Sequence, residues 1–331
     1  MVRKRRAHRW APLLLLLVAL AGCAISSVSL QRPETFDISC TQRNTGTSTQ
    51  TVPPHVVHTS TATLVLVPVC LARQGPYPFI LDTGAAQSLV DRSVADRLRL
   101  PVTGTATQAT GVACTSAAGQ VQVPDWSVGQ LPLRPQMLAS LSLGLPPGSP
   151  RIAGLLGSDV WSRFGQFRLD YRAGRLMLPG AEQSTAPTAA AGEHGGTELA
   201  ALGNRLVPMT IVHPGSGTLA LVPVTIGGQG PMKFVLDTGS SSSVVDRSVA
   251  QRLSLPPAGK ARRAAGVACA TTMQPVRVAT WQVGAVDLPA QNLDSIALAI
   301  PGLTGLLGSD VLYRFGTITV DYASARLVLA S

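Results

Sequence analysis

Motifs that mark several common enzyme classes do not occur in this sequence of 331 residues. There is no glycine-rich phosphate-binding loop and no Gly-x-Ser-x-Gly turn of the kind that presents a nucleophilic serine. A serine run is present at 240–243, but no histidine accompanies it in an order that would activate a serine. Apart from the N-terminus, no segment approaches the length of a transmembrane helix. These absences argue against a nucleotide-dependent enzyme, a serine hydrolase and a multi-span membrane protein.

Aromatic residues make up only 4% of the chain, and acidic residues are fewer than basic ones, so the formal net charge is +10. Five of the 27 basic residues lie within the first nine positions, however, and without them 22 basic residues remain against 17 acidic ones. The remaining basic residues are scattered and are not interleaved with aromatic ones. Nucleic-acid binding is therefore not expected.

The N-terminus combines these basic residues with an apolar run that ends at Gly22 and is too short to span a membrane. This pattern predicts a secretory signal peptide over residues 1–22. The sequence Leu-Ala-Gly-Cys at 20–23 resembles the bacterial lipobox, which implies lipid attachment at Cys23. We therefore expect an exported protein anchored to the bacterial cell envelope, on the periplasmic or outer-membrane face. The alternative is an ordinary signal peptide with a chance cysteine.

The tripeptide Asp-Thr-Gly occurs twice, at 82–84 and at 237–239, each time at the end of an apolar run. The same offset of 155 residues aligns Asp-Arg-Ser-Val-Ala at 91–95 with 246–250. An offset of 151 aligns Gly-Leu-Leu-Gly-Ser-Asp-Val at 154–160 with 305–311. A repeat of this length is too long for a solenoid unit and indicates a duplicated domain.

The repeat predicts two lobes, at 62–180 and at 206–331. A segment at 23–61 rich in Ser, Thr, Gln and Pro is predicted to be a flexible tether, and an Ala/Gly-rich segment at 181–205 is predicted to be a linker. A flexible linker of this length spans roughly 25–30 Å, so each lobe meets the other lobe of its own chain at about millimolar effective concentration. We therefore expect lobe pairing within one chain and a monomer.

Within each lobe the local pattern is mostly that of β-strands. Apolar runs at 63–69 and 218–224 lead through Gly-Pro turns into the strands that end at the two Asp-Thr-Gly tripeptides, and further strands are expected at 120–123, 167–171 and 175–178. One short helix is predicted in each copy, with Asp91 and Asp246 as N-caps. Each lobe is therefore expected to be a small closed β unit of an all-β protein with few short helices.

Taken together, these residues resemble the retropepsin-like aspartic proteases. The shared pattern is an apolar run, Asp-Thr-Gly, a short helix, a flap-like segment and an apolar strand ending in Leu-Leu-Gly, at 155–157 and 306–308. The resemblance implies the acid-protease fold, with two retropepsin-like closed β-barrel lobes related by a pseudo-dyad in a single chain. Ala86, Ser241, Ser158 and Ser309 stand where retropepsins have charged residues, which bears on the interlobe salt bridges and leaves the two Asp-Thr-Gly turns intact.

The predicted chemistry follows from bringing two carboxyl groups together. Two carboxylates about 4 Å apart repel by roughly 4 kcal/mol at an effective dielectric near 20, so one of them keeps a proton. The ionised carboxyl accepts a proton from a water while the protonated one donates to the substrate carbonyl. Asp82 and Asp237 are the predicted catalytic pair. Because Ser240 could donate a hydrogen bond to Asp237 where Ala85 cannot donate to Asp82, Asp237 is expected to be the ionised partner.

The resemblance also implies roles for the neighbouring residues. Thr83 and Thr238 are expected to bond the opposing turn, and Gly84 and Gly239 to leave room for close approach of the substrate. The flaps are expected at 103–123 and 258–278. The full set that supports the dyad is Thr83, Gly84, Ala85, Thr238, Gly239 and Ser240, and the flap residues expected to contact substrate are Gly111, Val112, Gly266 and Val267.

Besides Cys23, four cysteines remain, which allows three pairings. If the flap tips meet over the cleft as in retropepsins, Cys114 and Cys269 could form a disulfide that restrains flap opening, and the alternative is two small buried thiols. His55 and His58 could suggest a metal pair, but no carboxylate or cysteine completes a site, so no metal and no cofactor are expected.

The sequence thus predicts a membrane-anchored aspartic endopeptidase that acts on a peptide or protein substrate. Duplicated lobes without chemistry are the structural alternative to this reading. A protein of that kind would be a non-catalytic peptide-binding or envelope scaffold lipoprotein that retains protease-like lobes.

Overall fold

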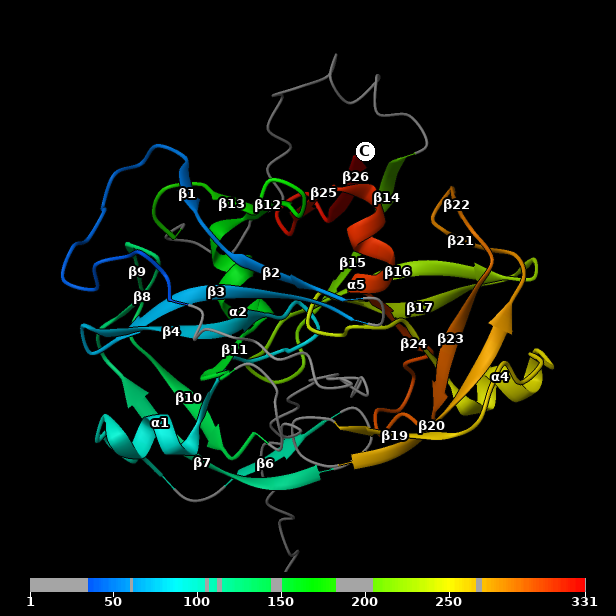
Figure 1. Cartoon of the computed structure of the whole chain (residues 1–331), viewed down its shortest axis with the longest axis horizontal. Helices are drawn as coiled ribbons and strands as arrows, with labels where there is room; N and C mark the ends of the chain where they lie inside the picture. Colours follow the sequence, from blue (N-terminus) through cyan, green and yellow to red (C-terminus); the bar gives the residue numbers. More distant parts are fainter. Residues whose placement is uncertain are drawn as a thin grey trace, which may run out of the picture.

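The computed structural model describes residues 35–59, 62–104, 107–111, 115–143, 151–182, 205–265 and 270–330. Strands predominate in this part of the chain and helices are short, as the all-β prediction requires. Figure 1 shows two similar lobes side by side, with a further sheet at one end between them. The predicted signal peptide, Cys23 and most of the predicted linker lie outside the described residues.

Lobe 1 is built on a ten-stranded sheet with the order β6-β7-β10-β5-β11-β4-β3-β8-β9, and β2 pairs with β3. The predicted strands are present, and most are longer than predicted because the local pattern marks only their buried centres. The strands are β2 (His55–His58), β3 (Thr63–Leu71), β4 (Gln74–Leu81), β5 (Leu89–Asp91), β6 (Thr107–Thr110), β7 (Thr115–Val123), β8 (Trp126–Val128), β9 (Leu131–Leu133), β10 (Gln136–Leu141) and β11 (Gly154–Leu156).

Lobe 2 repeats this sheet strand for strand, with the order β19-β20-β23-β18-β24-β17-β16-β21-β22, and β15 pairs with β16. Equal order and similar register in the two lobes show that the sequence repeat is a structural repeat. The strands are β15 (Thr210–Val212), β16 (Leu219–Ile226), β17 (Gln229–Asp237), β18 (Val244–Asp246), β19 (Arg262–Ala265), β20 (Ala270–Val278), β21 (Trp281–Val283), β22 (Val286–Leu288), β23 (Gln291–Ile296) and β24 (Gly305–Gly308).

A third sheet of six strands is shared by both lobes, in the order β1-β13-β12-β25-β26-β14. At its centre β12 of lobe 1 pairs antiparallel with β25 of lobe 2, so main-chain hydrogen bonds join the lobes directly. Local patterning cannot distinguish a strand that stays within its own lobe from one that pairs with the other. The strands are β1 (Gln50–Val52), β12 (Gln166–Asp170), β13 (Arg175–Leu178), β14 (Leu206–Pro208), β25 (Thr317–Asp321) and β26 (Arg326–Ala330).

The helices are short and lie beside the ends of strands. The predicted N-caps are confirmed, since the side chains of Asp91 and Asp246 accept hydrogen bonds from the second residue of α1 and of α4. Each lobe also has a second short helix, which the sequence did not predict. A helix of four residues is too short to show a helical periodicity. The helices are α1 (Arg92–Arg97), α2 (Ser158–Trp161), α4 (Arg247–Arg252) and α5 (Ser309–Leu312), with 3-10 turns η1 (Ser162–Phe164) and η3 (Tyr313–Phe315).

The prediction of a flexible tether over 23–61 is wrong for the described residues 35–59. Cys40 forms a disulfide with Cys70 of β3, and Arg43 forms an ion pair with Asp125 at 2.9 Å. The segment then continues as β1 and β2, so it belongs to lobe 1. Its polar composition misleads because pairing with β3 and β13 and the disulfide hold it in place, and none of these contacts is local.

The predicted bounds of the tether and of the linker also change at the edges of lobe 1. His58, which the sequence places in the tether, is a residue of β2; its Nδ1 bonds Thr63 Oγ1 and its ring stacks on Tyr313, with ring centroids 4.0 Å apart. Glu182, at the start of the predicted linker, forms ion pairs with Arg134 and Arg163 of lobe 1. No helix in the described part of the chain has the length and apolar character needed to cross a membrane.

Candidate active site

The two Asp-Thr-Gly turns lie at the ends of equivalent central strands. Asp82 follows β4 directly, and Asp237 is the last residue of β17. In lobe 1 the short strand β11 pairs in parallel with β4, and in lobe 2 β24 pairs in parallel with β17. These pairings hold the strand end from which each turn begins. Both Asp side chains are buried, with exposed fractions of 0% and 1%, because the two turns meet at the boundary between the lobes.

The glycine of each turn reports where the opposite carboxyl group lies. A Cβ atom added to Gly84 would overlap the whole carboxyl group of Asp237, at 2.6 Å from Oδ2. A Cβ atom added to Gly239 would overlap that of Asp82 in the same way. Each carboxyl therefore stands directly over the glycine of the opposing turn. We had expected these glycines to make room for substrate, whereas the structure shows that they make room for the partner carboxyl.

Thr83 and Thr238 join the two turns by reciprocal hydrogen bonds, as the resemblance predicted. The backbone N–H of Thr83 donates to Thr238 Oγ1 at 3.0 Å, and that hydroxyl donates to the Leu81 carbonyl at 2.7 Å. The equivalent bonds run from Thr238 N to Thr83 Oγ1 at 3.0 Å and from Thr83 Oγ1 to the Leu236 carbonyl at 2.7 Å. Because all four bonds cross between lobes, the relative position of the two carboxyl groups is set by the interface.

The two oxygens of each carboxyl group have different surroundings. Oδ1 of Asp82 accepts from the Ala85 N–H at 2.9 Å, and Oδ1 of Asp237 accepts from the N–H groups of Gly239 and Ser240 at 3.0 and 2.9 Å. Both Oδ2 atoms are buried and receive no hydrogen bond from the described part of the chain. The Oδ2 atoms, called the outer oxygens below, are therefore the ones available to a water or a substrate. The Oδ1 atoms are called the inner oxygens.

The predicted role of the Ser240 hydroxyl is wrong. Its proton is donated to the carbonyl of Ser242 at 2.7 Å, within the same turn, so it does not reach the outer oxygen of Asp237. The backbone N–H of Ser240 takes the place that the Ala85 N–H has in lobe 1. Since Ser240 and Ala85 act on the inner oxygens in the same way, the difference between them does not assign the ionised partner.

Burial raises the pKa of both carboxyl groups. It raises the pKa of Asp82 to about 7, and the backbone N–H groups of Ala85 and Gly84 offset only part of this effect. Burial, together with the negative charge of Asp82, raises the pKa of Asp237 well above its usual range. A buried pair this close holds at least one proton at neutral pH. Water activation between two carboxyls requires that one of them keep a proton, and this condition is met.

The raised pKa predicts a stability difference that depends on pH. In the unfolded chain Asp82 ionises near pH 4, whereas in the folded chain it stays protonated up to about pH 7, so the free energy of unfolding falls as pH rises between these values. Asp82→Asn removes this loss. We expect the variant to be more stable than the wild type at pH 7, by about 4 kcal/mol at most, and the difference to vanish near pH 4.

Denaturant titrations of both proteins from pH 4 to pH 8 measure this difference. Asp125→Asn is the control of opposite sign, because hydrogen bonds from Arg43 hold the pKa of Asp125 below its usual value. That variant should be less stable than the wild type by a nearly constant amount from pH 4 to pH 8, because the wild type gains this stabilisation below that range, between the lowered pKa and the ordinary pKa of an aspartate. Parallel pH curves for Asp82→Asn and the wild type would contradict the buried, protonated pair.

A second interlobe network lies beneath the turns. Ser158 of α2 donates to the Thr83 carbonyl at 2.8 Å and bonds the hydroxyl of Tyr322, a residue of lobe 2, at 2.7 Å. Since the Ser158 proton goes to Thr83, Tyr322 donates to Ser158. Ser309 donates in the same way to the Thr238 carbonyl at 2.9 Å. Neutral hydroxyl groups thus tie the lobes together where retropepsins use charged residues.

Tyr322 was not singled out in the sequence, although it has a repeat equivalent, Tyr171, at the offset of 151. The repetition of a tyrosine directly after equivalent strands was the signal by which the sequence could have identified it. Burial raises the pKa of both tyrosines. The Tyr171 hydroxyl is directed toward Ser309 but makes no hydrogen bond of good geometry within the described residues. The network is therefore stronger on the Tyr322 side.

Tyr322→Phe should lower the free energy of unfolding by about 1–2 kcal/mol, because it removes a buried hydrogen bond and leaves Ser158 without its donor. Tyr171→Phe is the matched variant and should cost less, since its hydroxyl contributes no such bond. Thermal and denaturant unfolding of the two variants give the comparison. An equal or larger loss in Tyr171→Phe would show that the Ser158 bond is not what stabilises this interface.

The predicted flap segments form hairpins at the same end of the molecule. β6 pairs with β7 in lobe 1, and β19 pairs with β20 in lobe 2. Figure 1 shows both hairpins at the end opposite the shared six-stranded sheet. Gly111, at the end of β6, is described and buried. Val112, Gly266 and Val267 lie outside the described residues, so their contacts with substrate stay predictions.

The disulfide of the structure joins Cys40 and Cys70, one of the three pairings open to the sequence. It excludes the two pairings that would have used either cysteine with Cys114 or Cys269. Those two cysteines lie outside the described residues, so the alternatives of a flap disulfide and two free thiols both stay open.

Each lobe also carries a buried carboxyl group with a structural role. Asp159 accepts from Ser88 Oγ at 2.7 Å and from Gln136 Nε2 at 2.9 Å, and Asp310 accepts equivalent bonds in lobe 2. Burial raises the pKa of both groups. Because both oxygens of each carboxyl already accept a bond, these groups are not available for chemistry as Asp82 and Asp237 are.

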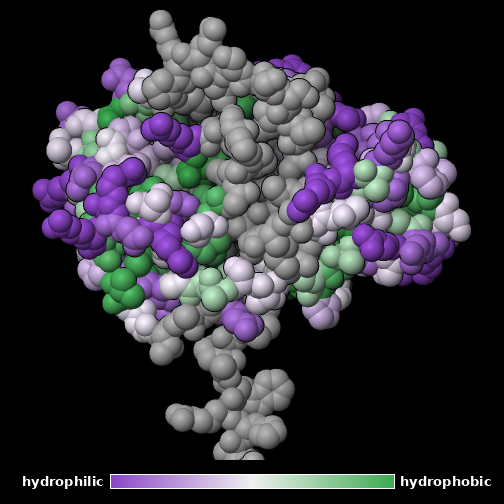
Figure 2. All heavy atoms as spheres, turned by 60° about the horizontal axis from the view of Figure 1, so that its bottom comes forward, coloured by the Kyte–Doolittle hydropathy of each residue, from purple (hydrophilic) through white to green (hydrophobic). Residues whose placement is uncertain are grey.

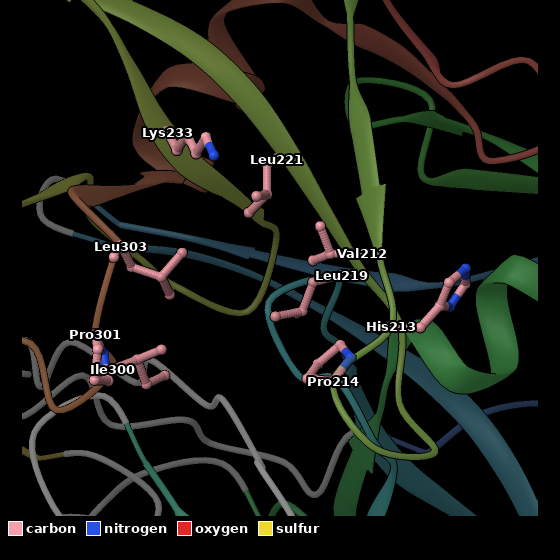
Figure 3. A pocket seen from close by; sticks show the side chains of 10 residues that line it. Val212, His213, Pro214, Leu219, Leu221, Lys233, Ile300, Pro301 and Leu303 are labelled. Carbon is pink, nitrogen blue, oxygen red and sulfur yellow. The ribbon is translucent and has the colours of Figure 1, made fainter.

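The two lobes differ in an apolar region beside β16 of lobe 2 and the equivalent strand β3 of lobe 1. In lobe 2 a groove of about 440 Å³ lies between Leu221, Lys233 and Leu303 (Figure 3). In lobe 1 the equivalent of Leu221 is Leu66, which packs in one cluster with Phe36 of the N-terminal segment. Phe36 of the N-terminal segment thus packs in lobe 1 against a residue whose lobe 2 equivalent lines an open groove.

Comparison with known protein families shows the same duplication. A family model described as "Aspartyl protease" matches residues 67–160 and 222–311, one match in each lobe and together more than half of the chain. No curated protein matches the chain in sequence.

Similar solved structures are two plant globulins and a bacterial protease. The basic 7S globulin from soybean has 12% identity, covers 86% of this chain and 95% of its own length, and has a TM-score of 0.41. Conglutin gamma, a basic 7S globulin from lupine seeds, has 10% identity over 86% and 96%, also with a TM-score of 0.41. A retropepsin-like aspartic protease from Rickettsia conorii has 19% identity, covers 41% of this chain and 96% of its own, and has a TM-score of 0.27.

Proposed function

Because this chain belongs to the aspartyl protease family, with one matching unit in each lobe, we propose that it is an aspartic endopeptidase whose catalytic pair is Asp82 and Asp237. One observation carries the proposal: each carboxyl lies over the glycine of the opposing turn, with its outer oxygen buried and without a hydrogen bond from the described residues. Burying two neighbouring carboxyls costs stability. If the pair served only to hold the fold together, two neutral side chains would do so better, so the arrangement indicates a chemical role.

The mechanism follows from the shared proton. The ionised carboxyl removes a proton from a water held between the outer oxygens, and the resulting hydroxide attacks the peptide carbonyl carbon. The protonated carboxyl donates to the carbonyl oxygen, which yields a neutral tetrahedral diol. The carboxyl that took the water proton then donates it to the amide nitrogen while a diol hydroxyl returns a proton to the other carboxyl, so that the C–N bond breaks, an amine and a carboxylic acid leave, and the pair is restored. The interlobe bonds of Thr83 and Thr238 hold both carboxyls in position throughout.

The proposed substrate is an extended polypeptide bound between the carboxyl pair and the two hairpins β6–β7 and β19–β20. An extended peptide can bond its main chain to such hairpins as an added strand, which leaves the choice of sequence to the side-chain pockets. We further propose, from the N-terminal pattern alone, that the protein is exported and attached to the cell envelope through lipid on Cys23, and, from the length of the linker, that it is monomeric. Mass spectrometry of the mature N-terminal peptide would test the lipid.

The function is tested by incubating the protein with an unfolded protein substrate such as casein between pH 4 and pH 8 and identifying the products by mass spectrometry. New internal peptide termini that require Asp82 support the endopeptidase. Binding of the substrate without any Asp82-dependent cleavage would instead indicate the peptide-binding protein that is its non-catalytic alternative.

A further inference from the structure

The two flap segments differ completely in charge. Residues 103–123 of lobe 1 contain no charged residue. The equivalent residues 258–278 of lobe 2 contain Lys260, Arg262, Arg263 and Arg277 and no acidic residue. All four basic residues are exposed. Since the folds of the two lobes repeat strand for strand, this difference is a property of the side chains and not of the scaffold.

Arg262 is the member of this set that is tied to the candidate active site. From β19 its Nη2 atom donates to both carboxyl oxygens of Asp294, at 2.9 and 2.8 Å. Asp294 also accepts from Ser242 Oγ at 2.8 Å, and Ser242 belongs to the turn that follows Asp237. Arg262 therefore connects the flap hairpin of lobe 2 with the turn that carries one of the two catalytic carboxyls.

The surroundings of Arg262 leave one end of its side chain accessible. The Asp294 side chain is only 4% exposed and is fully occupied, whereas 49% of the Arg262 side chain is exposed. Of the guanidinium nitrogens, only Nη2 bonds Asp294, and Nε donates to the sulfur of Met273. Met273 belongs to an apolar cluster that includes Ala86 of lobe 1. Figure 2 views the molecule with this end forward and shows hydrophilic side chains of lobe 2 reaching toward the middle of the face.

Lobe 1 provides the comparison without this ion pair. The residues equivalent to Ser242, Arg262 and Asp294 are Gln87, Thr107 and Ala139, none of them charged. A substrate lying across both lobes would thus meet a cationic half and a neutral half. Because Asp294 compensates the charge of Arg262, the excess positive charge at this end comes from the other three basic residues, which would attract an acidic peptide.

We propose that the lobe 2 half of the cleft contains a subsite for a glutamate or aspartate side chain of the substrate, with Arg262 as the group that binds its carboxylate. This inference rests on the proposed endopeptidase function and adds the class of substrate. With Nη2 donating to Asp294 and Nε to Met273, the Nη1 group of Arg262 is the donor that can bind a substrate carboxylate, and Asp294 acts as the positioning residue that keeps the guanidinium group oriented. Acidic side chains on the lobe 1 side find no equivalent group.

The experiment uses pairs of peptides that differ only by Glu or Gln at one position, with that position moved stepwise along both sides of the scissile bond. The wild type should prefer Glu by about tenfold in kcat/KM at one position on one side only. Arg262→Thr, which installs the lobe 1 residue, should bring this ratio close to one. Arg277→Thr removes the same charge farther along the hairpin and should keep the ratio.

Binding of the same peptides to the Asp82→Asn protein, measured by fluorescence anisotropy, repeats the comparison without hydrolysis. If the wild type cleaves neither peptide, the proposed function fails, and the binding ratio still decides the inference. Equal ratios for the wild type and Arg262→Thr, or loss of the ratio in Arg277→Thr as well, would overturn it. Arg262→Lys, which keeps a charge but has a single nitrogen for both Asp294 and the substrate, covers the case in which Arg262→Thr does not fold, and it should retain only part of the preference.

Discussion

Asp82→Asn and Asp237→Asn should each lower the rate of peptide hydrolysis by about 10³-fold or more, because each removes one half of a general acid–base pair. Asparagine has nearly the same size, and its amide oxygen can accept the backbone hydrogen bonds that now reach Oδ1 of Asp82 or Asp237. The fold should therefore survive while the shared proton is lost. Rates are measured on the peptide that the wild type cleaves best, at the pH of its optimum.

The control for burial is Asp159→Asn. Asp159 is also a buried carboxyl with a raised pKa, but both of its oxygens already accept bonds from Ser88 and Gln136. At a temperature where it remains folded, this variant should keep most of its activity. Unchanged hydrolysis in Asp82→Asn and Asp237→Asn would remove the catalytic assignment.

Gly84→Ala and Gly239→Ala should be nearly as damaging, with activity reduced by about 10²-fold or more. The added methyl group would overlap the carboxyl group of the opposing aspartate, and that carboxyl is buried and cannot turn away without losing the backbone hydrogen bonds that its Oδ1 accepts. A displacement of about 1 Å is enough for a loss of this size. Overpacking should also lower the free energy of unfolding by about 1–3 kcal/mol.

Gly259→Ala is the matched control. A Cβ at that position would lie 3.7 Å from its nearest neighbour, Pro275, which is ordinary contact. This variant should keep both activity and stability. Wild-type rates in Gly84→Ala would show that the two turns are farther apart in solution than in the structure, and that the opposed carboxyls do not share a proton.

Residues that act within their own segment were predicted correctly. The end of the strand at Asp82, the helix capped by Asp91 and their counterparts in lobe 2 each depend on neighbours only a few residues away, so local pattern is sufficient. The exchange of hydrogen bonds between Thr83 and Thr238 joins residues 155 apart. It was predicted only because a known family shares the motif.

Predictions failed where the exact geometry of a turn, or a contact between distant residues, decides the outcome. The Ser240 hydroxyl has two acceptors within reach in principle, the Asp237 carboxyl and the Ser242 carbonyl, and only the folded turn selects the second. The segment from 35 to 59 has the composition of a tether, but Cys70 and strands β3 and β13 hold it against lobe 1. Composition reports the average preference of a segment and contains no information about such partners.

The duplication, the two acidic turns, the all-β character and the charge difference between the flap segments were determined by the sequence alone, since repeats, strand patterns and charges are properties of neighbouring residues. The tertiary structure alone decided that β12 and β25 pair across the lobes, that each glycine faces the other carboxyl, that Tyr322 bonds Ser158, and that Arg262 meets Asp294. Each of these depends on bringing distant parts of the chain together, and burial of both lobes around a common boundary provides the free energy for it.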